Sequence, residues 1–243
     1  MKKLVLPALF AVAAFSLSTA ALAAPSLDEV LTNLQNNQGK IKDLYAETVT
    51  KITSNLQLTT RNQTKTMEQK GKIWSKGDKL SKIEIDSPMK QITITNGDKM
   101  MITNPETGQK MIQDLKKLRQ QSGGDNSGQM NLAKAKEMFD LSLAEKDSNY
   151  IVSGVPKQAN QFLGKLEFYI DPSRWVPTKI IMYDPKGKQV SQSELTYQQV
   201  NGLTVPAAVK SAISSPAGAM KVEMSYQNVK VNQGLSDSVF KIE

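Results

Sequence analysis

The sequence predicts a mainly β protein of the α+β type: an antiparallel meander of about ten or eleven strands, with one helix before it and a short one within it. Three observations support this prediction. Short runs alternate apolar with polar residues, turn residues separate these runs every ~8 to 12 residues, and two segments have helical spacing instead. Helices in such a protein must bury an apolar stripe, and the open side of a curved sheet offers that place.

The amino-terminal segment has the pattern of an export signal. Lys2 and Lys3 precede an uncharged apolar run over 4–20, and residues 21–23 supply the small-x-small motif that signal peptidase reads. The alternative is a transmembrane anchor, but the run is short and contains a proline. We therefore expect a cleaved signal peptide over 1–23.

The rest of the chain, 24–243, has a length that suits one large β domain. The sequence contains no Cys, so it has neither an acylation site for a lipoprotein anchor nor a disulfide. We expect a single periplasmic domain that is not itself lipidated. The net charge of the full chain is +8 and comes mainly from Lys, which favours a solvated surface first, and second a transient contact with an anionic membrane or an acidic partner protein. The export signal and the scarcity of Arg disfavour nucleic acid as a partner.

The first element after the signal is predicted to be an amphipathic helix. Residues 26–29, Ser-Leu-Asp-Glu, form a capping-box sequence that can satisfy amides of the first helical turn. Apolar residues then recur at helical spacing, at Leu27, Val30, Leu31 and Leu34.

From Tyr45 onward the spacing changes to that of strands. Ile83 and Ile85 alternate with charged residues, as expected for a sheet with one apolar face. The sequences Lys76-Gly77-Asp78 and Asn96-Gly97-Asp98 are typical of hairpin turns. This part of the chain is therefore predicted to be an antiparallel meander.

A polar, glycine-rich segment over 120–128 interrupts the strands, and helical spacing returns over 130–139. Alternation resumes from Leu166 to Ile170, and the sequence over 184–188 predicts another turn. The short internal helix thus lies inside an otherwise β sequence.

The composition disfavours an enzyme, and we expect no cofactor and no metal. The absence of His removes the commonest general base and metal ligand, and the absence of Cys removes thiol nucleophiles. Ser87 and Lys90 have the S-x-x-K spacing of penicillin-recognising enzymes, but Pro88 and the strand pattern after it place Ser87 in a turn. The carboxylates lie on polar strand faces or in turns.

A large apolar sheet face and 11 Met residues favour a protein that binds apolar material. Unbranched thioethers adapt to varied shapes, although strand residues such as Met182 and Met224 also suit an ordinary core. The candidate residues for a cavity lining are Trp74, Ile83, Ile85, Ile92, Ile94, Met100, Ile102, Met111, Met138, Phe139, Phe168 and Ile170.

One hairpin allows a sharper expectation about the two faces of the sheet. We expect Ile92 and Ile94 to share a face with Met100 and Ile102, and this face to line the cavity. Met101 should then point the other way, available to a neighbouring helix or a partner.

Several short motifs follow one another along the chain, namely Gly71-Lys72-Ile73-Trp74, Lys76-Gly77-Asp78-Lys79, Asn96-Gly97-Asp98, Asn104-Pro105-Glu106, Tyr183-Asp184-Pro185-Lys186-Gly187, Val200-Asn201-Gly202-Leu203-Thr204-Val205-Pro206 and the run from Val231 to Phe240. In type and order they resemble the LolA-like family of outer-membrane lipoprotein-sorting and carrier proteins. Together they cover nearly all of the chain after the signal.

The resemblance implies a strongly curved antiparallel sheet that forms an incomplete half-barrel, closed by the amino-terminal helix and the short internal helix. It also implies a hydrophobic cavity for the acyl chains of lipoproteins or related lipids. An inner-membrane complex would release this cargo and an outer-membrane acceptor would receive it. In that family an early-strand Arg helps to hold the lid, and Lys82 is the residue here that approximates it. The alternative is a regulatory module that senses lipids or lipoproteins through a protein partner.

Overall fold

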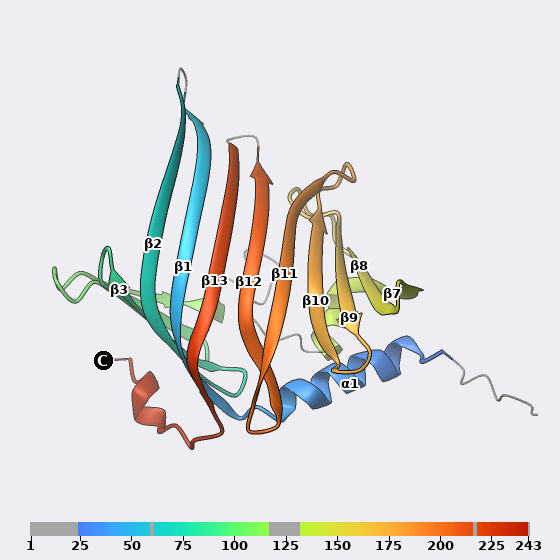
Figure 1. Cartoon of the computed structure of the whole chain (residues 1–243), viewed down its shortest axis with the longest axis horizontal. Helices are drawn as coiled ribbons and strands as arrows, with labels where there is room; N and C mark the ends of the chain where they lie inside the picture. The colour runs from blue at the N-terminus through green and yellow to red at the C-terminus, as the bar shows by residue number, and fades with distance from the viewer. Residues whose placement is uncertain (1–23, 59–60, 117–131, 216–217, 243) are drawn as a thin grey trace, which may run out of the picture.

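The computed structural model describes residues 24–58, 61–116, 132–215 and 218–242. The expected signal peptide lies outside these residues. Thirteen described strands form one antiparallel sheet with the order β6-β5-β4-β3-β2-β1-β13-β12-β11-β10-β9-β8-β7 (Figure 1). Neighbours in the sheet are consecutive in sequence except where β1 pairs with β13, so two meanders meet along that ladder. The predicted mainly β, antiparallel class is confirmed.

The first meander begins with two strands of 16 residues each, whose Thr, Asn and Gln residues obscure the alternation of apolar and polar positions. The strands of this meander are β1 (Asp43–Leu58), β2 (Arg61–Lys76), β3 (Leu80–Ser87), β4 (Gln91–Asn96), β5 (Lys99–Thr103) and β6 (Lys110–Asp114). The second meander contains β7 (Phe139–Lys146), β8 (Asn149–Pro156), β9 (Lys165–Asp171), β10 (Val176–Tyr183), β11 (Gln189–Val200), β12 (Leu203–Ser215) and β13 (Gly218–Val231).

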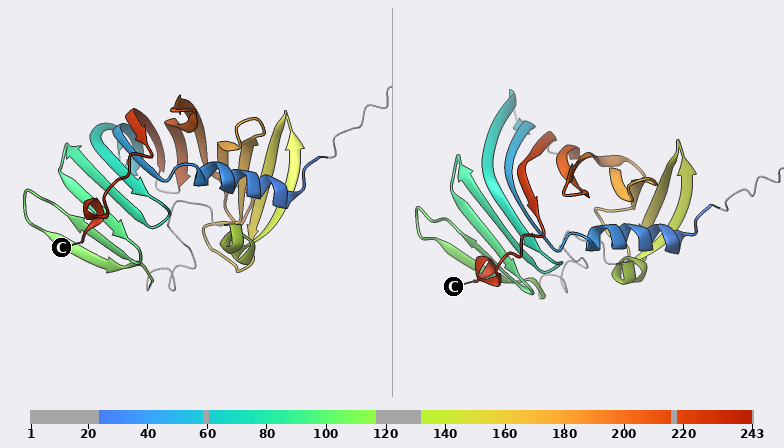
Figure 2. Two further views of the ribbon diagram at one scale, coloured as in Figure 1. Left: turned by 90° about the horizontal axis from the view of Figure 1, so that it is seen from below. Right: turned by 60° about the horizontal axis from the view of Figure 1, so that its bottom comes forward.

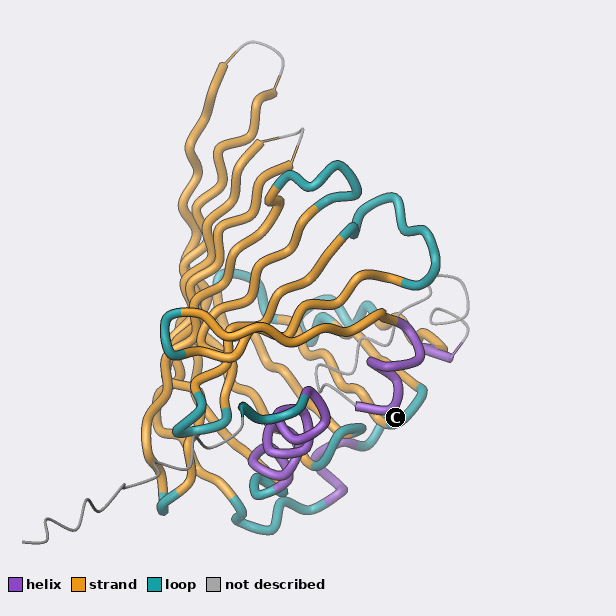
Figure 3. Tube along the Cα trace, turned by 90° about the vertical axis from the view of Figure 1, so that its right-hand side faces the viewer, coloured by secondary structure: helices purple, strands orange, loops and turns teal. Residues whose placement is uncertain are grey.

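The sheet curves into an arc whose edge strands, β6 and β7, do not pair with each other (Figure 2). The helix α1 (Leu27–Gly39) crosses the opening of this arc on the side of the second meander. In the side view the hairpin of β1 and β2 projects beyond its neighbours (Figure 3). The expected half-barrel is therefore present.

The amino-terminal helix has the predicted capping box. Ser26 Oγ accepts a hydrogen bond from the Glu29 amide at 3.3 Å, and Glu29 Oε2 accepts one from the Ser26 amide at 2.6 Å. The internal helix α3 (Leu132–Met138) ends one residue before the predicted limit, because Phe139 begins β7, and the first two residues of the predicted range, 130 and 131, lie outside the described residues. A short 3-10 helix, η1 (Asp237–Phe240), follows the last strand. Among the described helices, none has the length and apolar character needed to cross a bilayer.

The pairing register divides the sheet into two faces. Side chains directly opposite each other in an antiparallel pair point to the same side, and successive residues alternate. We call the side that carries α1 the inner face and the other side the outer face. One row of the inner face runs from β9 to β2 through Phe168, Ile180, Ser193, Ser211, Val222, Ile52 and Met67.

The outer face of the central strands carries an alternating row of charges. From β10 to β2 the directly paired residues are Lys179, Glu194, Lys210, Glu223, Lys51 and Glu68. Opposite charges paired in this way contribute ~0.2–1 kcal/mol each, whereas like charges would repel. This charge row marks a solvated face.

The outer face near the first edge is covered by the carboxyl-terminal segment. The carboxylate of Asp43 is buried and accepts hydrogen bonds from the amides of residues 233–235 at 2.8 to 3.3 Å. Phe240 is fully buried and packs on Ile94 and Met101. Met101, which the sequence left available to a helix or partner, is therefore covered by its own chain.

Candidate functional site

The inner face beneath α1 forms one apolar cluster. Val30, Leu31 and Leu34 of the helix are buried against Val152 of β8 and Ile170 of β9. Fully burying side chains of this size contributes about 1.5–3 kcal/mol each, so packing fixes the helix to this end of the sheet.

Two small hollows remain between the helices and the sheet. The first, about 20 Å³, lies between Leu34 of α1 and Pro177 of β10. The second, about 80 Å³, lies between Leu31 of α1, Ala135 of α3 and Phe168 of β9, and its described lining is apolar. Apolar space thus persists under the helices.

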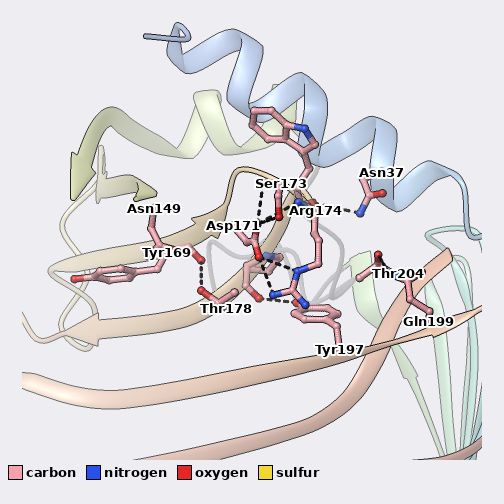
Figure 4. Close-up of polar contacts among 12 residues, drawn as sticks. Asn37, Asn149, Tyr169, Asp171, Ser173, Arg174, Thr178, Tyr197, Gln199 and Thr204 are labelled. Atoms are coloured by element: carbon pink, nitrogen blue, oxygen red, sulfur yellow. Dashed lines mark hydrogen bonds and ion pairs between the residues drawn. The ribbon is translucent and has the colours of Figure 1, made fainter. Parts of the chain in front are cut away.

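The turn between β9 and β10 supports α1 from below (Figure 4). Trp175 adopts a positive φ of 51°, and its ring stacks on Tyr150 with centroids 5.8 Å apart. The carbonyl oxygen of Trp175 accepts a hydrogen bond from the side chain of Asn37 in α1 at 3.3 Å. The turn is therefore bonded to the helix through the Trp175 carbonyl, and the Trp175 ring packs against the apolar cluster that includes the helix.

An ion pair holds this turn in shape. Arg174 donates to the Asp171 carboxylate through Nε at 2.8 Å and through Nη2 at 2.7 Å. Burial opposes ionisation of Asp171, but hydrogen bonds from Ser173 and Arg174 outweigh it and lower the pKa of Asp171 to about 2. The Arg174 guanidinium also lies 5.9 Å from the ring of Tyr197, whose hydroxyl donates to the Pro177 carbonyl at 2.6 Å.

The two helices are also linked to each other. Lys136 of α3 pairs with Asp28 of α1 at 2.6 Å, and Lys157 donates to the Lys136 carbonyl at 2.7 Å. Both ion-pair side chains are exposed, so this contact is weaker than the pair within the turn.

Beyond α1 the inner face is uncharged across β11, β12, β13 and β1, and Lys65 of β2, which pairs with Ser54, is the first charge beyond these strands in that row. Three consecutive rows of β11, β12, β13 and β1 consist of Ser191, Ile213, Met220 and Ser54, then Ser193, Ser211, Val222 and Ile52, then Leu195, Val209, Met224 and Thr50. These side chains are half-buried, except for Thr50, which is buried. An apolar chain can lie across these rows without removing water from a charge.

A larger hollow of about 380 Å³ opens on the inner face of the first meander, and we call it the edge hollow. Its apolar walls are Met67, Ile85, Pro88, Met89, Ile102 and Met111, and its polar lining is Gln69, Lys90, Gln91, Thr103, Asn104, Gln109 and Lys110. Met67, Met89 and Met111 are 40%, 73% and 47% exposed, so these apolar side chains face solvent. The size lies within the ~300–1,000 Å³ typical of ligand sites.

The structure places eleven of the twelve candidate lining residues on the two faces of the sheet and one in a helix. Eight lie on the inner face, namely Ile83, Ile85, Met100, Ile102, Met111, Phe139, Phe168 and Ile170. Trp74, Ile92 and Ile94 lie on the outer face. Met138 is the last residue of α3 and is half-buried.

The expectation that Ile92, Ile94, Met100 and Ile102 share one face is wrong. Ile94 is paired with Met101, whereas Ile102 is paired with Thr93. In a hairpin with a two-residue turn, the sequence numbers of two directly paired residues add up to an odd value. An even-numbered residue of β4 is therefore paired with an odd-numbered residue of β5, and the two side chains lie on the same face of the sheet. Here each pair sums to 195, as Asn96 with Lys99 shows.

Lys82 also lies on the outer face, away from α1. It pairs with Glu84 at 2.6 Å, and its ammonium lies 5.1 Å from the centre of the Trp74 ring. The cation in contact with the turn beneath α1 is Arg174 instead. Sequence reasoning missed Arg174, although Asp171-Pro172-Ser173-Arg174 has the signature of a turn with an acidic first residue.

The inner face offers contacts for an apolar chain and neutral polar groups, and few groups for chemistry. Within the described ranges no three acidic side chains gather closely enough to hold a metal ion. Sequence reasoning also missed Met67 and Met220 as inner-face residues, because the long strands that carry them lack clear alternation.

Comparisons with known proteins agree with this geometry. A family model described as an uncharacterized protein matches residues 95–243, and no curated protein matches the sequence. A DUF1329 family protein from Desulfovibrio piger superposes with a TM-score of 0.66 at 17% identity, over 90% of this chain and 98% of that chain.

Two further solved structures are similar in fold. A LolA superfamily protein from Nitrosomonas europaea gives a TM-score of 0.61 at 14% identity, over 90% of this chain and 99% of that chain. An outer membrane lipoprotein-sorting protein domain from Vibrio parahaemolyticus gives a TM-score of 0.61 at 15% identity, over 88% of this chain and 97% of that chain. At these identities the likeness is one of fold.

Proposed function

Because the chain belongs to the family of uncharacterized proteins matched over 95–243 and has a LolA-like fold, we propose that it is a periplasmic carrier of acyl chains. In this proposal the signal peptide over 1–23 is cleaved and residues 24–243 act as one domain. The cargo is the acyl part of an outer-membrane lipoprotein or a related lipid. Binding and release, without chemical conversion, make up the activity.

The observation that carries the proposal is the contrast between the two faces of one sheet. On β13, Val222 and Met224 point to the uncharged inner face, whereas Glu223 between them belongs to the charge row. Burying an acyl chain contributes about 0.8 kcal/mol per methylene, and the inner face of β11, β12, β13 and β1 presents a surface without charges for it.

The cover over this surface is partial, which suits a carrier that must also release its cargo. Among the described elements, α1 and α3 lie over the end formed by β7 to β10. The edge hollow at the other end is open to solvent through Met67, Met89 and Met111. A carrier that delivers lipoproteins would receive them from an inner-membrane complex and pass them to an outer-membrane acceptor.

Acyl binding can be tested with variants of adjacent residues. Val222→Thr combined with Met224→Gln keeps the side-chain volumes close to those of the wild type but adds polar groups to the inner face. We expect about a tenfold loss of affinity for a fluorescent fatty acid, because these groups lose hydrogen bonds to water when the chain binds. Glu223→Gln is the control and should bind as the wild type does.

The identity of the cargo is tested separately by native mass spectrometry of protein purified from periplasm. The ability to take up a lipoprotein is tested by measuring its release from spheroplasts. The carrier proposal requires a bound acyl species and release that the double variant lacks. Equal binding by the inner-face and outer-face variants, or no acyl ligand at all, would rule it out.

A further inference from the structure

Two hydroxyl groups lie among the apolar rows of the inner face without a protein partner. Thr50 of β1 is paired with Met224 of β13, and Thr48 is paired with Tyr226, so Thr50 and Tyr226 occupy adjacent inner-face rows of one ladder. Side chains in this diagonal relation have Cβ atoms ~7–8 Å apart, within reach of an aromatic ring. Neither the Thr50 nor the Tyr226 hydroxyl forms a hydrogen bond with a described residue.

Burial makes these unbonded hydroxyls unusual. Thr50 is 7% exposed and Tyr226 is half-buried. Burial alone raises the pKa of Tyr226, which agrees with a phenol that has neither a hydrogen-bond partner nor a charged neighbour. Most buried polar groups in proteins are bonded, as Ser193 and Ser211 are to each other at 2.7 Å on the same face. Two buried hydroxyls left as donors at one place therefore suit a ligand that brings an acceptor.

The surroundings of the two hydroxyls are suited to a neutral acceptor. The row of Thr50 continues into Met224 on one side and Gln69 on the other, and Thr48 beside Tyr226 is also uncharged. Taking a carboxylate out of water without a cation costs far more than taking out a neutral carbonyl group. A free fatty acid is therefore disfavoured at this place relative to an ester.

We infer that Thr50 and Tyr226 bind the ester carbonyl that joins an acyl chain to glycerol. The inference rests on the proposed function and deepens it, because it names acyl esters, as distinct from free fatty acids, as the ligand class. A carbonyl oxygen has two lone pairs and accepts from both hydroxyls at once. Tyr226 is accessible because it is half-buried, and the unbranched side chain of Met224 beside Thr50 is flexible enough to move aside.

Apolar surface on either side of the two hydroxyls gives the acyl chain a path. In one direction the row of Thr50 leads through Gln69, which lines the edge hollow. In the other direction it leads through Met224, Val209 and Leu195 toward the strands beneath α1. A chain attached to an ester at this place therefore reaches uncharged surface whichever way it runs.

The experiment compares ester-linked with ether-linked lipid, because an ether keeps the chains and the headgroup but lacks the carbonyl. The probes are dioctanoyl phosphatidylcholine, its dioctyl ether analogue and octanoate, each measured by displacement of a fluorescent fatty acid. The test variant is Tyr226→Phe with Thr50→Val, which removes both hydroxyls and nearly keeps the side-chain shapes. The matched control, Tyr169→Phe with Thr53→Val, makes the same changes on the outer face.

We expect the wild type to bind the ester lipid about fivefold more tightly than the ether lipid, as one net hydrogen bond provides. The test variant should bind the two lipids equally, with its affinity for the ether lipid within about twofold of the wild type. The control should keep the preference of the wild type. In urea unfolding the test variant should be at least as stable as the wild type, because it loses no hydrogen bond within the protein.

Acyl esters occur both in phospholipids and in the diacylglyceryl anchor of lipoproteins. A dioctanoylglyceryl-cysteine peptide presents this second source of the ester, and it should lose affinity in the test variant as the phospholipid does. The ligand that the wild type binds more tightly of these two identifies the source of the ester.

Equal affinity of the wild type for the ester and ether lipids, or a preference that survives in the test variant, would overturn the inference and leave acyl binding intact. A clear loss of stability in the test variant would also overturn it, because the hydroxyls would then have partners in the protein. A loss of octanoate affinity as large as that of the ester lipid would overturn the choice of an ester. Failure of every acyl probe to bind the wild type would instead refute the proposed function.

Discussion

Replacing Asp171 with Asn tests whether charge holds the turn beneath α1. The substitution keeps the shape of the side chain and leaves an oxygen to accept the bonds from Ser173. It removes the negative partner of Arg174, which now makes two short contacts to the carboxylate. The turn should loosen, and with it the contact between Trp175 and the helix.

The size of the effect follows from the pKa of Asp171. It falls from 3.8 to about 2 in the folded protein, which corresponds to about 2 kcal/mol of stability. Only 19% of this side chain is exposed, so solvent screens the interaction little. Because the folded-state pKa is lowered, the contribution is complete above the unfolded value near pH 4 and is lost as the pH falls through about 2.

The assay is urea unfolding followed by circular dichroism at pH 6, 4, 3 and 2. Asp171→Asn should be about 2 kcal/mol less stable than the wild type at pH 6, and the difference should shrink below about 1 kcal/mol at pH 2. Asp28→Asn removes an exposed ion pair and should cost less than about 1 kcal/mol. A difference between wild type and Asp171→Asn that stays constant with pH would refute the reasoning.

Three other outcomes are expected. Phe240→Ala should cost about 3–5 kcal/mol in urea unfolding yet leave acyl affinity unchanged, since Phe240 packs on the outer face; a parallel loss of binding would contradict this. Gly71→Ala should cost about 1–3 kcal/mol, because its Cβ would lie 2.1 Å from the Glu84 carbonyl oxygen, whereas Gly39→Ala has open space and serves as control. Peroxide oxidation of the edge-hollow methionines should weaken acyl binding several-fold, reversibly with sulfoxide reductase, and their replacement by Leu should abolish that sensitivity.

Local signals in the sequence predicted local structure well. The capping box of Ser26 and Glu29 fixes the start of α1, and the glycines of both hairpin turns adopt the positive φ that these turns require, 57° at Gly77 and 60° at Gly97. Each of these features depends on residues within four positions of one another.

Features that depend on distant partners were not predicted. The first hairpin lacks a clear alternation of apolar and polar residues, so its length, which follows from pairing with β13, was not predicted. Burial of Met101 depends on Phe240, which is far along the chain. In contrast, the sequence does determine on which face of the sheet Ile94 and Ile102 lie, because the pairing of β4 with β5 follows from the two-residue turn between them.

The charge row has a consequence for how the long strands find their partners. A slip of two residues keeps every side chain on its own face, so apolar burial alone does not oppose it strongly. Such a slip would place Lys210 or Lys51 opposite Lys221, or Lys51 opposite Lys70, where a glutamate now stands. Repulsion between these lysines opposes a slip in this direction, and a slip in the other direction loses the lysine–glutamate pairs by placing Ser225 or Thr66 opposite the lysines. High salt during refolding should therefore increase the yield of misaligned sheets.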